Sequence, residues 1–375
     1  MKILVNASNL GPGGATQVAD SFCCSLNRFS DKEFVVVLTP QMKNIADKIE
    51  RYNNVKIVEY QIKNSWRTYL FARDKFLDDL VKKEQIDMVF SVFAPTWWTP
   101  KIPHLCGFAL AHLVMPESPY FKMLPFKKKI KQKLENKILT FFYWRCSKYY
   151  YTENPMVSER VQKLLHCKHV YTVTNYYNQV FDQPEYQKYK QLPSFDGITM
   201  LTITSAYPHK NLSIAIGIAY ELKKNYPDFK FRFVFTITAA EFPGLPKDLR
   251  GNFLFIGKVD ITECPSLYEQ CDIAFQPTLL ECFTATYPEA MRMSKPIVTT
   301  DLEFARGLCG DAAVYYDALS AKDAADKIYK LAFDTQLQTE LVLNGEKQLN
   351  NFDNYTKRAN KFIGLCHEVL WPLSK

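Results

Sequence analysis

The chain has 375 residues, of which 47% are hydrophobic and 23% are charged, and its formal net charge is +8. A single core stops growing well below this length, so we expect two globular domains. No apolar run approaches the ~20 residues of a membrane span, and the N-terminal apolar run is too short for a signal peptide, which excludes an integral membrane protein. The ten cysteines follow no zinc-binding spacing, so we expect reduced cytoplasmic thiols and no metal site.

Short β-rich runs alternate with segments of helical spacing in the first part of the chain. These runs are KILV (2–5), EFVVVL (33–38), NVKIVEY (54–60) and IDMVFSV (86–92). Alternation of this kind favours a parallel sheet covered by helices.

A glycine-rich turn at residues 9–14 joins the first predicted strand to a helix expected over 15–29. Backbone amides at such a turn can approach an anion. A dinucleotide fingerprint would place a glycine at Thr16 and an acidic residue at the end of the second strand, where the chain has Thr39 and Pro40. The nicotinamide interpretation is therefore disfavoured. The turn either contacts a phosphate or an acceptor, or serves only to reverse the chain.

An aromatic, proline-rich region follows, with a strand expected over 105–111 that delivers His112 into a loop. A histidine at the carboxyl end of a parallel strand points toward the crevice where α/β sheets bind ligands. A lone histidine is more often a surface or core residue, so both interpretations of His112 stay open.

Residues 126–142 predict a basic amphipathic helix, because apolar residues recur every four positions from Phe126 to Phe142 with lysines between them. The lysines could attract an anionic leaflet at roughly 1 kcal/mol each while the apolar stripe enters the interface. The alternative is a core-facing helix with a solvated lysine face. Nucleic acid fits poorly, since no stacking aromatic residues are interleaved with the lysines. The lysines assigned to the membrane are Lys127, Lys128, Lys129 and Lys131.

A second alternating series begins after a polar segment over 179–195, which we interpret as the interdomain linker. The expected strands lie within 198–204, 229–238, 252–257, 271–278 and 295–301, with helices over 211–225 and up to residue 270. The fold class is therefore α/β: two tandem, doubly wound, Rossmann-like domains over 1–180 and 196–352 that face each other across a cleft. The segment 353–375 carries a final helix that we expect to return to the first domain.

Two glutamates stand out in the second half of the chain. Glu281 lies in a polar loop after an apolar run, and Glu289 lies in the opening turn of a predicted helix. An ionised carboxylate can accept two sugar hydroxyl hydrogen bonds, so the pair suits a polyhydroxyl ligand. Glu289 has a second explanation, because Thr286 and Glu289 form a T-x-x-E capping-box pattern with Pro288 in the first turn. Glu281 has no such local explanation.

The stretches TSAYPHKN, FIGKV, ECFTATYPEAMRMSKPIVTTD and CGDAAVYYD resemble, in order and spacing, the second domain of the GT-B retaining glycosyltransferases of family GT4, the glycosyl transferases group 1. The block of that family, E-G-F-G-x-x-x-x-E-A-M-x-x-G-x-P-V-V, is matched at Glu281, Phe283, Glu289, Ala290, Met291, Pro296, Ile297 and Val298. The glycine-rich turn, His112 and VTNYYN, with Asn175, extend the resemblance to the first domain.

The resemblance implies roles for these residues. Glu289 would hold the ribose and Glu281 the transferred sugar, while Lys210 with His209 would neutralise the diphosphate. Backbone amides of Phe283 and Thr284 would contact the diphosphate. The remaining assignments are Gly257, Lys258 and Val259 at the nucleobase, His112 at the transferred sugar, and Asn9, Gly11, Gly13 and Gly14 near the diphosphate and acceptor.

Four positions depart from the family pattern. Ser205 stands where an arginine is common, which removes one of two cations expected on the diphosphate. Cys282, Thr284 and Ser294 replace glycines, which restricts the approach of backbone to phosphate.

The resemblance implies a metal-independent, retaining hexosyltransferase that needs no cofactor, since the chain lacks the DxD of metal-dependent enzymes. It would use a UDP- or GDP-linked sugar and a saccharide or polyprenyl-linked acceptor in cell-surface polysaccharide biosynthesis, of capsule or lipopolysaccharide. We expect a cytoplasmic protein, peripheral on the inner face of the cytoplasmic membrane. The alternatives are a GT-B nucleotide-sugar epimerase and a catalytically weak nucleotide-sugar-binding partner of another transferase.

Overall fold

The computed structural model describes residues 1–11, 13–63 and 65–371, without the side chains of residues 66 and 67. Its contacts divide the chain into two compact units. Unit 1 comprises Met1–Val114, Pro125–Asn175 and Asp353–Lys375, of which the last four residues lie outside the described part. Unit 2 comprises Met115–Leu124 and Tyr176–Phe352.

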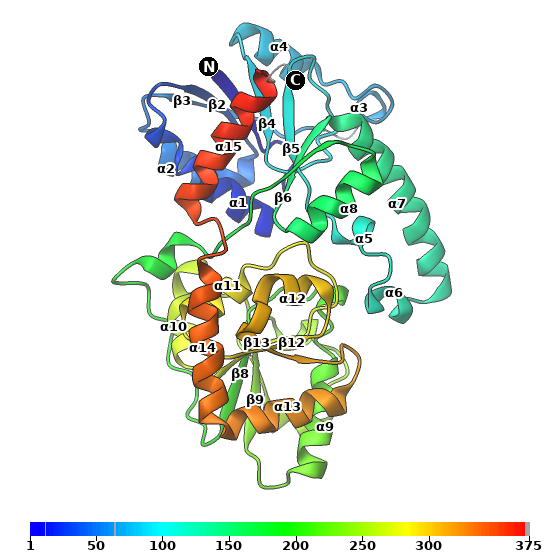
Figure 1. The fold of residues 1–375 in the computed structure, drawn as a ribbon, viewed down its shortest axis with the longest axis vertical. Coiled ribbons are helices and arrows are strands. Elements are labelled where there is room, and N and C mark those ends of the chain that lie inside the picture. Colours follow the sequence, from blue (N-terminus) through cyan, green and yellow to red (C-terminus); the bar gives the residue numbers. More distant parts are fainter. Residues whose placement is uncertain (12, 64, 372–375) are drawn as a thin grey trace. The chain divides into compact units, whose positions relative to one another are not determined.

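Unit 1 is built on a seven-stranded parallel sheet in the order β3-β2-β1-β4-β5-β6-β7 (Figure 1). Its strands are β1 (Lys2–Asn6), β2 (Glu33–Leu38), β3 (Val55–Glu59), β4 (Met88–Ser91), β5 (His104–Gly107), β6 (Tyr149–Thr152) and β7 (His169–Thr172). Ile3 lies opposite Phe34 on one side and Met88 on the other. Runs such as Val35–Val37 are apolar at every position because both faces of the sheet are buried.

Helices cover both faces of this sheet and bury two separate apolar clusters. The helices of unit 1 are α1 (Gly14–Cys23), α2 (Lys43–Ile49), α3 (Trp66–Phe71), α4 (Lys75–Lys83), α5 (Ala111–Val114), α7 (Phe126–Cys146), α8 (Pro155–Leu165) and α15 (Tyr355–Leu370), with 3-10 turns at Leu26–Arg28 and Pro40–Met42. Within the described residues, no helix is both long and apolar enough to cross a bilayer.

The final helix, α15, packs against α1, β4 and β5 (Figure 1). Phe362 is buried there, and its ring lies 5.0 Å from that of Phe90 and 4.6 Å from that of Tyr151. The end of the chain is therefore part of the core that the first strands form.

Unit 2 has a six-stranded parallel sheet in the order β10-β9-β8-β11-β12-β13. Its strands are β8 (Ile198–Thr202), β9 (Phe231–Phe235), β10 (Phe253–Phe255), β11 (Ile273–Gln276), β12 (Ile297–Thr300) and β13 (Ala313–Tyr316). Its helices are α6 (Pro119–Met123), α9 (Ile214–Asn225), α10 (Cys264–Glu269), α11 (Thr286–Arg292), α12 (Glu303–Cys309), α13 (Ala321–Phe333) and α14 (Thr335–Leu349), with 3-10 turns at Gln179–Asp182, Pro208–Lys210, Ala239–Glu241, Lys247–Asn252, Ile261–Glu263 and Gly310–Ala312.

Most predicted strands are confirmed within two or three residues of their ends, but three expectations were wrong in detail. The strand expected over 105–111 ends at Gly107, and His112 lies in the short helix α5 rather than in a loop. The helix expected over 15–29 ends at Cys23 and gives way to a 3-10 turn. The segment read as a linker is docked on unit 2, where Tyr189 N donates to Ser266 Oγ (3.1 Å) and Leu192 N donates to Gln270 Oε1 (2.8 Å).

We predict that Phe362→Ala lowers the free energy of unfolding of unit 1 by about 3–5 kcal/mol, because it empties a buried aromatic position. Hydrogen exchange would show the loss as faster exchange in β4 and β6. Asn360→Ala is the control, since Asn360 is exposed on the same helix. Equal protection in both variants would mean that α15 is dispensable for the unit 1 core.

Candidate functional site

The strand order of unit 2 reverses between β8 and β11. From β8 the chain proceeds to β9 and β10 on one side, and from β11 it proceeds to β12 and β13 on the other. Loops that leave the carboxyl ends of two such strands diverge, and the crevice between them is where open α/β sheets bind ligands. The candidate residues Lys210 and Glu281 follow β8 and β11, respectively.

The structure brings these two residues into direct contact. Lys210 Nζ lies 2.5 Å from Glu281 Oε1, and both side chains are largely shielded from solvent. Thr278 Oγ1 also donates to Glu281 Oε1 (2.7 Å), which fixes the carboxylate from its own loop. The backbone adds a further link, because Leu279 N donates to the carbonyl of His209 (2.8 Å). A cation and a carboxylate are thus held together at the switch point, 71 residues apart in sequence.

The segment Met115–Leu124 completes this part of unit 2, although it lies far earlier in the chain. The buried Ser118 donates from Oγ to the carbonyl of Leu279 (2.7 Å). The Tyr120 ring lies edge-on to the His209 ring at 6.2 Å, and the Tyr207 ring stacks on His209 at 5.7 Å. Sequence reasoning missed this segment, since only the tertiary contacts reveal it.

Glu289 is buried in the first turns of α11, where Tyr268 OH donates to Oε2 at 3.4 Å. Burial raises the pKa of Glu289 to about 7, and the Tyr268 hydrogen bond offsets part of that rise in pKa. The capping-box explanation was wrong. The helix begins at Thr286, with Ala285 at the N-cap, and Thr286 Oγ1 hydrogen-bonds to Thr284 Oγ1 (2.8 Å). Helix capping therefore does not explain the buried carboxyl group of Glu289.

The two residues expected to contact a diphosphate lie in the same loop. Phe283 is half-buried and its ring packs edge-on against Phe352 at 5.8 Å, while Thr284 is buried. Helix α11 has seven residues, too few for us to assign it a strong dipole contribution. Amides of this loop and Lys210 are the groups that can meet an anion here.

The other expected residues of unit 2 lie at the same edge of its sheet. Ser205 is exposed in the loop between β8 and Lys210. Gly257, with φ of 75°, follows β10, and Lys258 next to it is exposed while Val259 is half-buried. Gly257, Lys258 and Val259 lie two strands from the Lys210 loop, whereas Ser205 lies within it. Their assignment to a nucleobase stays a prediction.

The unit 1 candidates occupy the corresponding switch point between β1 and β4. Asn9 Nδ2 donates to the carbonyls of Phe93 (2.8 Å) and Pro95 (3.1 Å), so the glycine-rich turn is tied to the loop after β4. Gly11, Gly13 and Gly14 are exposed, and Gly13 has a φ of 131° that favours glycine. The structure thus explains Gly13 by backbone conformation and leaves the turn accessible to a ligand.

His112 is half-buried in α5, and its Nε2 has no hydrogen-bond partner among the described residues. Burial lowers its pKa, although Glu135 opposes this change in pKa. A neutral imidazole with an unsatisfied nitrogen suits a role at a ligand better than a satisfied core position.

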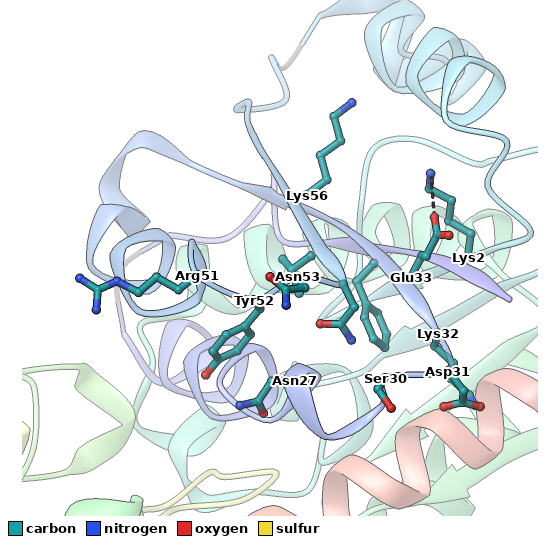
Figure 2. A pocket seen from close by; sticks show the side chains of 13 residues that line it. Lys2, Asn27, Ser30, Asp31, Lys32, Glu33, Arg51, Tyr52, Asn53 and Lys56 are labelled. Carbon is teal, nitrogen blue, oxygen red and sulfur yellow. Dashed lines mark hydrogen bonds and ion pairs between the residues drawn. The ribbon is translucent and has the colours of Figure 1, made fainter.

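A cavity of about 680 Å³ lies elsewhere in unit 1 (Figure 2). It lies beside the amino ends of β1, β2 and β3, at Lys2, Glu33 and Val55, which is the edge opposite to that used by ligands of parallel sheets. Figure 2 shows Lys2 and Glu33 turned toward each other, and they form an ion pair (3.2 Å). Its polar lining has mixed charges that already pair internally, so we do not assign it the catalytic role.

One grouping of metal-ligand type lies in unit 1, where His104, Cys106 and Cys146 converge below the surface. It does not involve the residues considered so far.

The chain is similar to known glycosyltransferases in sequence and in fold. Residues 185–348 match the family model described as glycosyl transferases group 1. No curated protein sequence matches the chain significantly. Similar solved structures include a glycosyltransferase from Rickettsia africae ESF-5 (15% identity, 99% of both chains, TM-score 0.73). HepE of Anabaena in complex with UDP-glucose is similar at 14% identity, 98% of this chain and 100% of that chain, and a TM-score of 0.68. WaaG, a glycosyltransferase involved in lipopolysaccharide biosynthesis, is similar at 12% identity, 98% of this chain and 99% of that chain, and a TM-score of 0.68.

These likenesses confirm the GT-B fold of two Rossmann-like domains. The family match covers the part of unit 2 that carries Lys210, Glu281 and Glu289, and it supports glycosyl transfer as the class of activity.

We predict that Glu289→Gln stabilises the protein above neutral pH. An unfolded glutamate titrates near ~4.3, so between that pH and about 7 the folded protein keeps a proton that the unfolded chain has released. Stability contributed by this group therefore falls as pH rises through that window. Glutamine cannot ionise, so the variant should gain about 1–3 kcal/mol at pH 8 and little at pH 4. Urea unfolding at both pH values measures the difference.

Glu340→Gln, at an exposed position on α14, is the matched control and should show no such trend. A gain for Glu289→Gln that is equal at both pH values would contradict the raised pKa.

Proposed function

We propose that this protein is a retaining glycosyltransferase that moves a hexose from a nucleoside diphosphate sugar to a lipid-linked or saccharide acceptor in cell-surface polysaccharide biosynthesis. The observation that carries the proposal is the Lys210–Glu281 pair at the switch point of unit 2. A donor sugar diphosphate offers both an anion for the ammonium group and hydroxyls for the carboxylate. The match to glycosyl transferases group 1 favours family GT4.

The bonding of the pair leaves capacity for a ligand. Thr278 and Lys210 both use Oε1 of Glu281, so Oε2 can accept from hydroxyls of the transferred sugar. Lys210 has three donors and uses one on Glu281, and the others can reach a diphosphate. In the ligand-free protein, Glu281 thus holds the Lys210 ammonium group in place before the donor arrives. This arrangement reduces the reorganisation of the site that donor binding requires.

Glu289 suits the ribose of the donor nucleotide. Its carboxyl group is buried with one long hydrogen bond from Tyr268, so two ribose hydroxyls would replace missing partners and favour the ionised form. The HepE structure contains UDP-glucose, which supports a UDP-linked donor here, with a GDP-linked donor as the alternative.

The reaction is a substitution at the anomeric carbon. The bond from that carbon to the diphosphate oxygen breaks, and the acceptor oxygen forms a new bond on the same face. The acceptor proton passes to an oxygen of the departing diphosphate. Lys210 and the loop amides stabilise the negative charge that develops on that group, so neither a metal ion nor an enzymic nucleophile is required for the step. His112 would contact the transferred sugar.

Ser205 favours a second candidate function, binding of a nucleotide sugar without turnover, because the family's arginine is missing at that position. A transfer assay separates the two, since binding without transfer would support the weak partner. Release of an altered sugar nucleotide without an acceptor would instead indicate an epimerase.

The exposed face of α7 supports a membrane-bound acceptor. The core-facing alternative for this helix was wrong, because its apolar stripe faces solvent: Phe126 is 76% exposed and Trp144 is 61% exposed. The other exposed members of the stripe are Ile130, Leu134, Ile138 and Phe141. Residues facing the protein, Tyr143 and Cys146, lie on the opposite side of the helix.

The apolar surface extends from α7 to α3. The Tyr69 ring lies 5.7 Å from that of Phe142, and Leu70 and Phe71 next to it are exposed. Exposed lysines lie among and beside these apolar residues, so apolar side chains can enter the acyl boundary while the long lysine side chains reach lipid phosphates. We propose that this surface docks on the anionic inner face of the cytoplasmic membrane, where a polyprenyl-linked acceptor would be found.

The transfer mechanism predicts separable effects of three substitutions. Lys210→Met should lower kcat by about 10²–10³-fold, as expected for loss of an electrostatic contact that strengthens in the transition state. Glu289→Ala should weaken UDP binding by about 10–100-fold, because it removes hydrogen bonds to a charged group. Glu281→Gln should lower turnover while leaving UDP affinity within about threefold of the parent. Calorimetric UDP binding and transfer of radiolabelled sugar to a lipid extract measure these effects.

Lys247→Met is the control for loss of a surface lysine, because Lys247 is exposed in unit 2. If the Glu289→Ala variant binds UDP as tightly as the parent protein, Glu289 does not bind the ribose.

The membrane proposal predicts that replacing Lys127, Lys128, Lys129 and Lys131 with glutamine reduces sedimentation with phosphatidylglycerol vesicles by at least tenfold. Substituting Lys43, Lys82, Lys101 and Lys148, which are exposed elsewhere on unit 1, changes net charge equally and should have little effect. An equal loss of sedimentation in both sets of variants would mean that only the net charge of the protein matters and that α7 has no specific role.

A further inference from the structure

Three side chains of metal-ligand type converge in the core of unit 1. His104 and Cys106 project from the same face of β5, two residues apart, and Cys146 ends α7. The sulfur atoms of Cys106 and Cys146 lie 3.6 Å apart, and Cys106 Sγ lies 3.1 Å from His104 Nε2. All three residues are buried.

These separations are close to those of a zinc site without zinc. A tetrahedral ion with Zn–S bonds of about 2.3 Å holds its sulfur atoms roughly 3.8 Å apart and a nitrogen ligand roughly 3.6 Å from each sulfur. The sulfur pair already has this spacing. The distance from Cys106 Sγ to His104 Nε2 is about 0.5 Å shorter than in such a site, and the three ligand atoms all lie within 4.8 Å of one another.

The surroundings of His104 fix the nitrogen that would bind. Nδ1 lies 3.2 Å from the carbonyl oxygen of Cys146, so Nδ1 carries the proton and Nε2 presents its lone pair to the sulfur atoms. A backbone carbonyl on the second ring nitrogen is the usual support of a metal-ligating histidine.

A hydroxyl oxygen lies beside these three ligands. In the metal-free protein it donates its proton to His104 Nε2, so the hydroxyl must rotate away when an ion binds. Ser91 Oγ lies 2.8 Å from His104 Nε2, and Asn6 Nδ2 donates to Ser91 Oγ (3.2 Å). Asn6 Oδ1 in turn accepts from Ser8 at the start of the turn that leads to Asn9. The cluster is therefore continuous, through hydrogen bonds, with the glycine-rich turn of unit 1.

We propose that His104, Cys106 and Cys146 form a structural site for Zn²⁺, with Ser91 Oγ as the fourth donor. Binding replaces two thiol protons by the ion, so two thiolates and Zn²⁺ give a neutral group that can stay buried. The ion joins β4, β5 and the end of α7 at one point. It is distinct from the transfer chemistry, which needs no metal, and it holds the helix that carries the proposed membrane surface.

The test uses the full chain after dialysis against a chelator, titrated with Co²⁺ as a spectroscopic substitute for Zn²⁺. We expect one Co²⁺ per chain with a thiolate-to-metal charge-transfer band, displaced by Zn²⁺, and an affinity that falls as pH is lowered because the thiols must deprotonate. Added Zn²⁺ should raise the Tm. Cys106→Ala and Cys146→Ala should each lose the band and the rise in Tm.

Cys366→Ala is the matched control, since Cys366 is also buried in unit 1, and it should keep both properties. A parent protein that gives no charge-transfer band overturns the proposal even if a variant fails to fold. A band that persists in the Cys106/Cys146 double variant also overturns it, as does mass spectrometry showing a Cys106–Cys146 disulfide in place of bound metal.

Discussion

The ion pair between Lys210 and Glu281 depends on one topological constraint, the reversal of strand order between β8 and β11. Two neighbouring parallel strands whose following segments turn to opposite sides must leave a gap at their carboxyl ends. Side chains carried by the two loops can meet in this gap, because the backbone of the loops does not fill it. Local structure then supports the pair, because Thr278 fixes the carboxylate and Leu279 binds the backbone beside Lys210.

Desolvation explains the difference between the two glutamates. Glu281 keeps a cation at contact distance, so its charge is compensated in the free protein. Glu289 is buried with only a weak hydroxyl partner, which raises its pKa to about 7. A buried carboxyl group in this condition is unfavourable for stability, and a strongly raised pKa in a buried group is typical of a functional site.

Unit 1 has apolar residues in two settings, a buried core on its sheet and an exposed stripe along α7. Where helices cover the sheet, aromatic side chains such as Phe22, Phe90 and Phe362 interlock, so the last helix of the chain is part of the core that the first strands form. Along α7 the apolar residues point away from the protein instead. An exposed stripe of this size is uncommon on a protein that meets only water. The lysines beside it are the reason that we propose an anionic surface as its partner.

The sequence by itself determined most strands and the α/β class, because strand periodicity is a local property. Its resemblance to a known family at Glu281 and Glu289 nominated the residues of the candidate site. It also identified the segment of α7 as a basic helix with apolar residues at every fourth position. It could not decide which way α7 faces, since an apolar stripe is the same whether it meets a core or a membrane. Contacts made across long separations were likewise beyond it: the Lys210–Glu281 pair, the docking of Ser118 on Leu279, and the meeting of His104 and Cys106 with Cys146. The capping-box prediction at Thr286 failed for a related reason. The pattern requires Thr286 to be the N-cap residue, whereas the helix begins one residue earlier, with Ala285 at the N-cap.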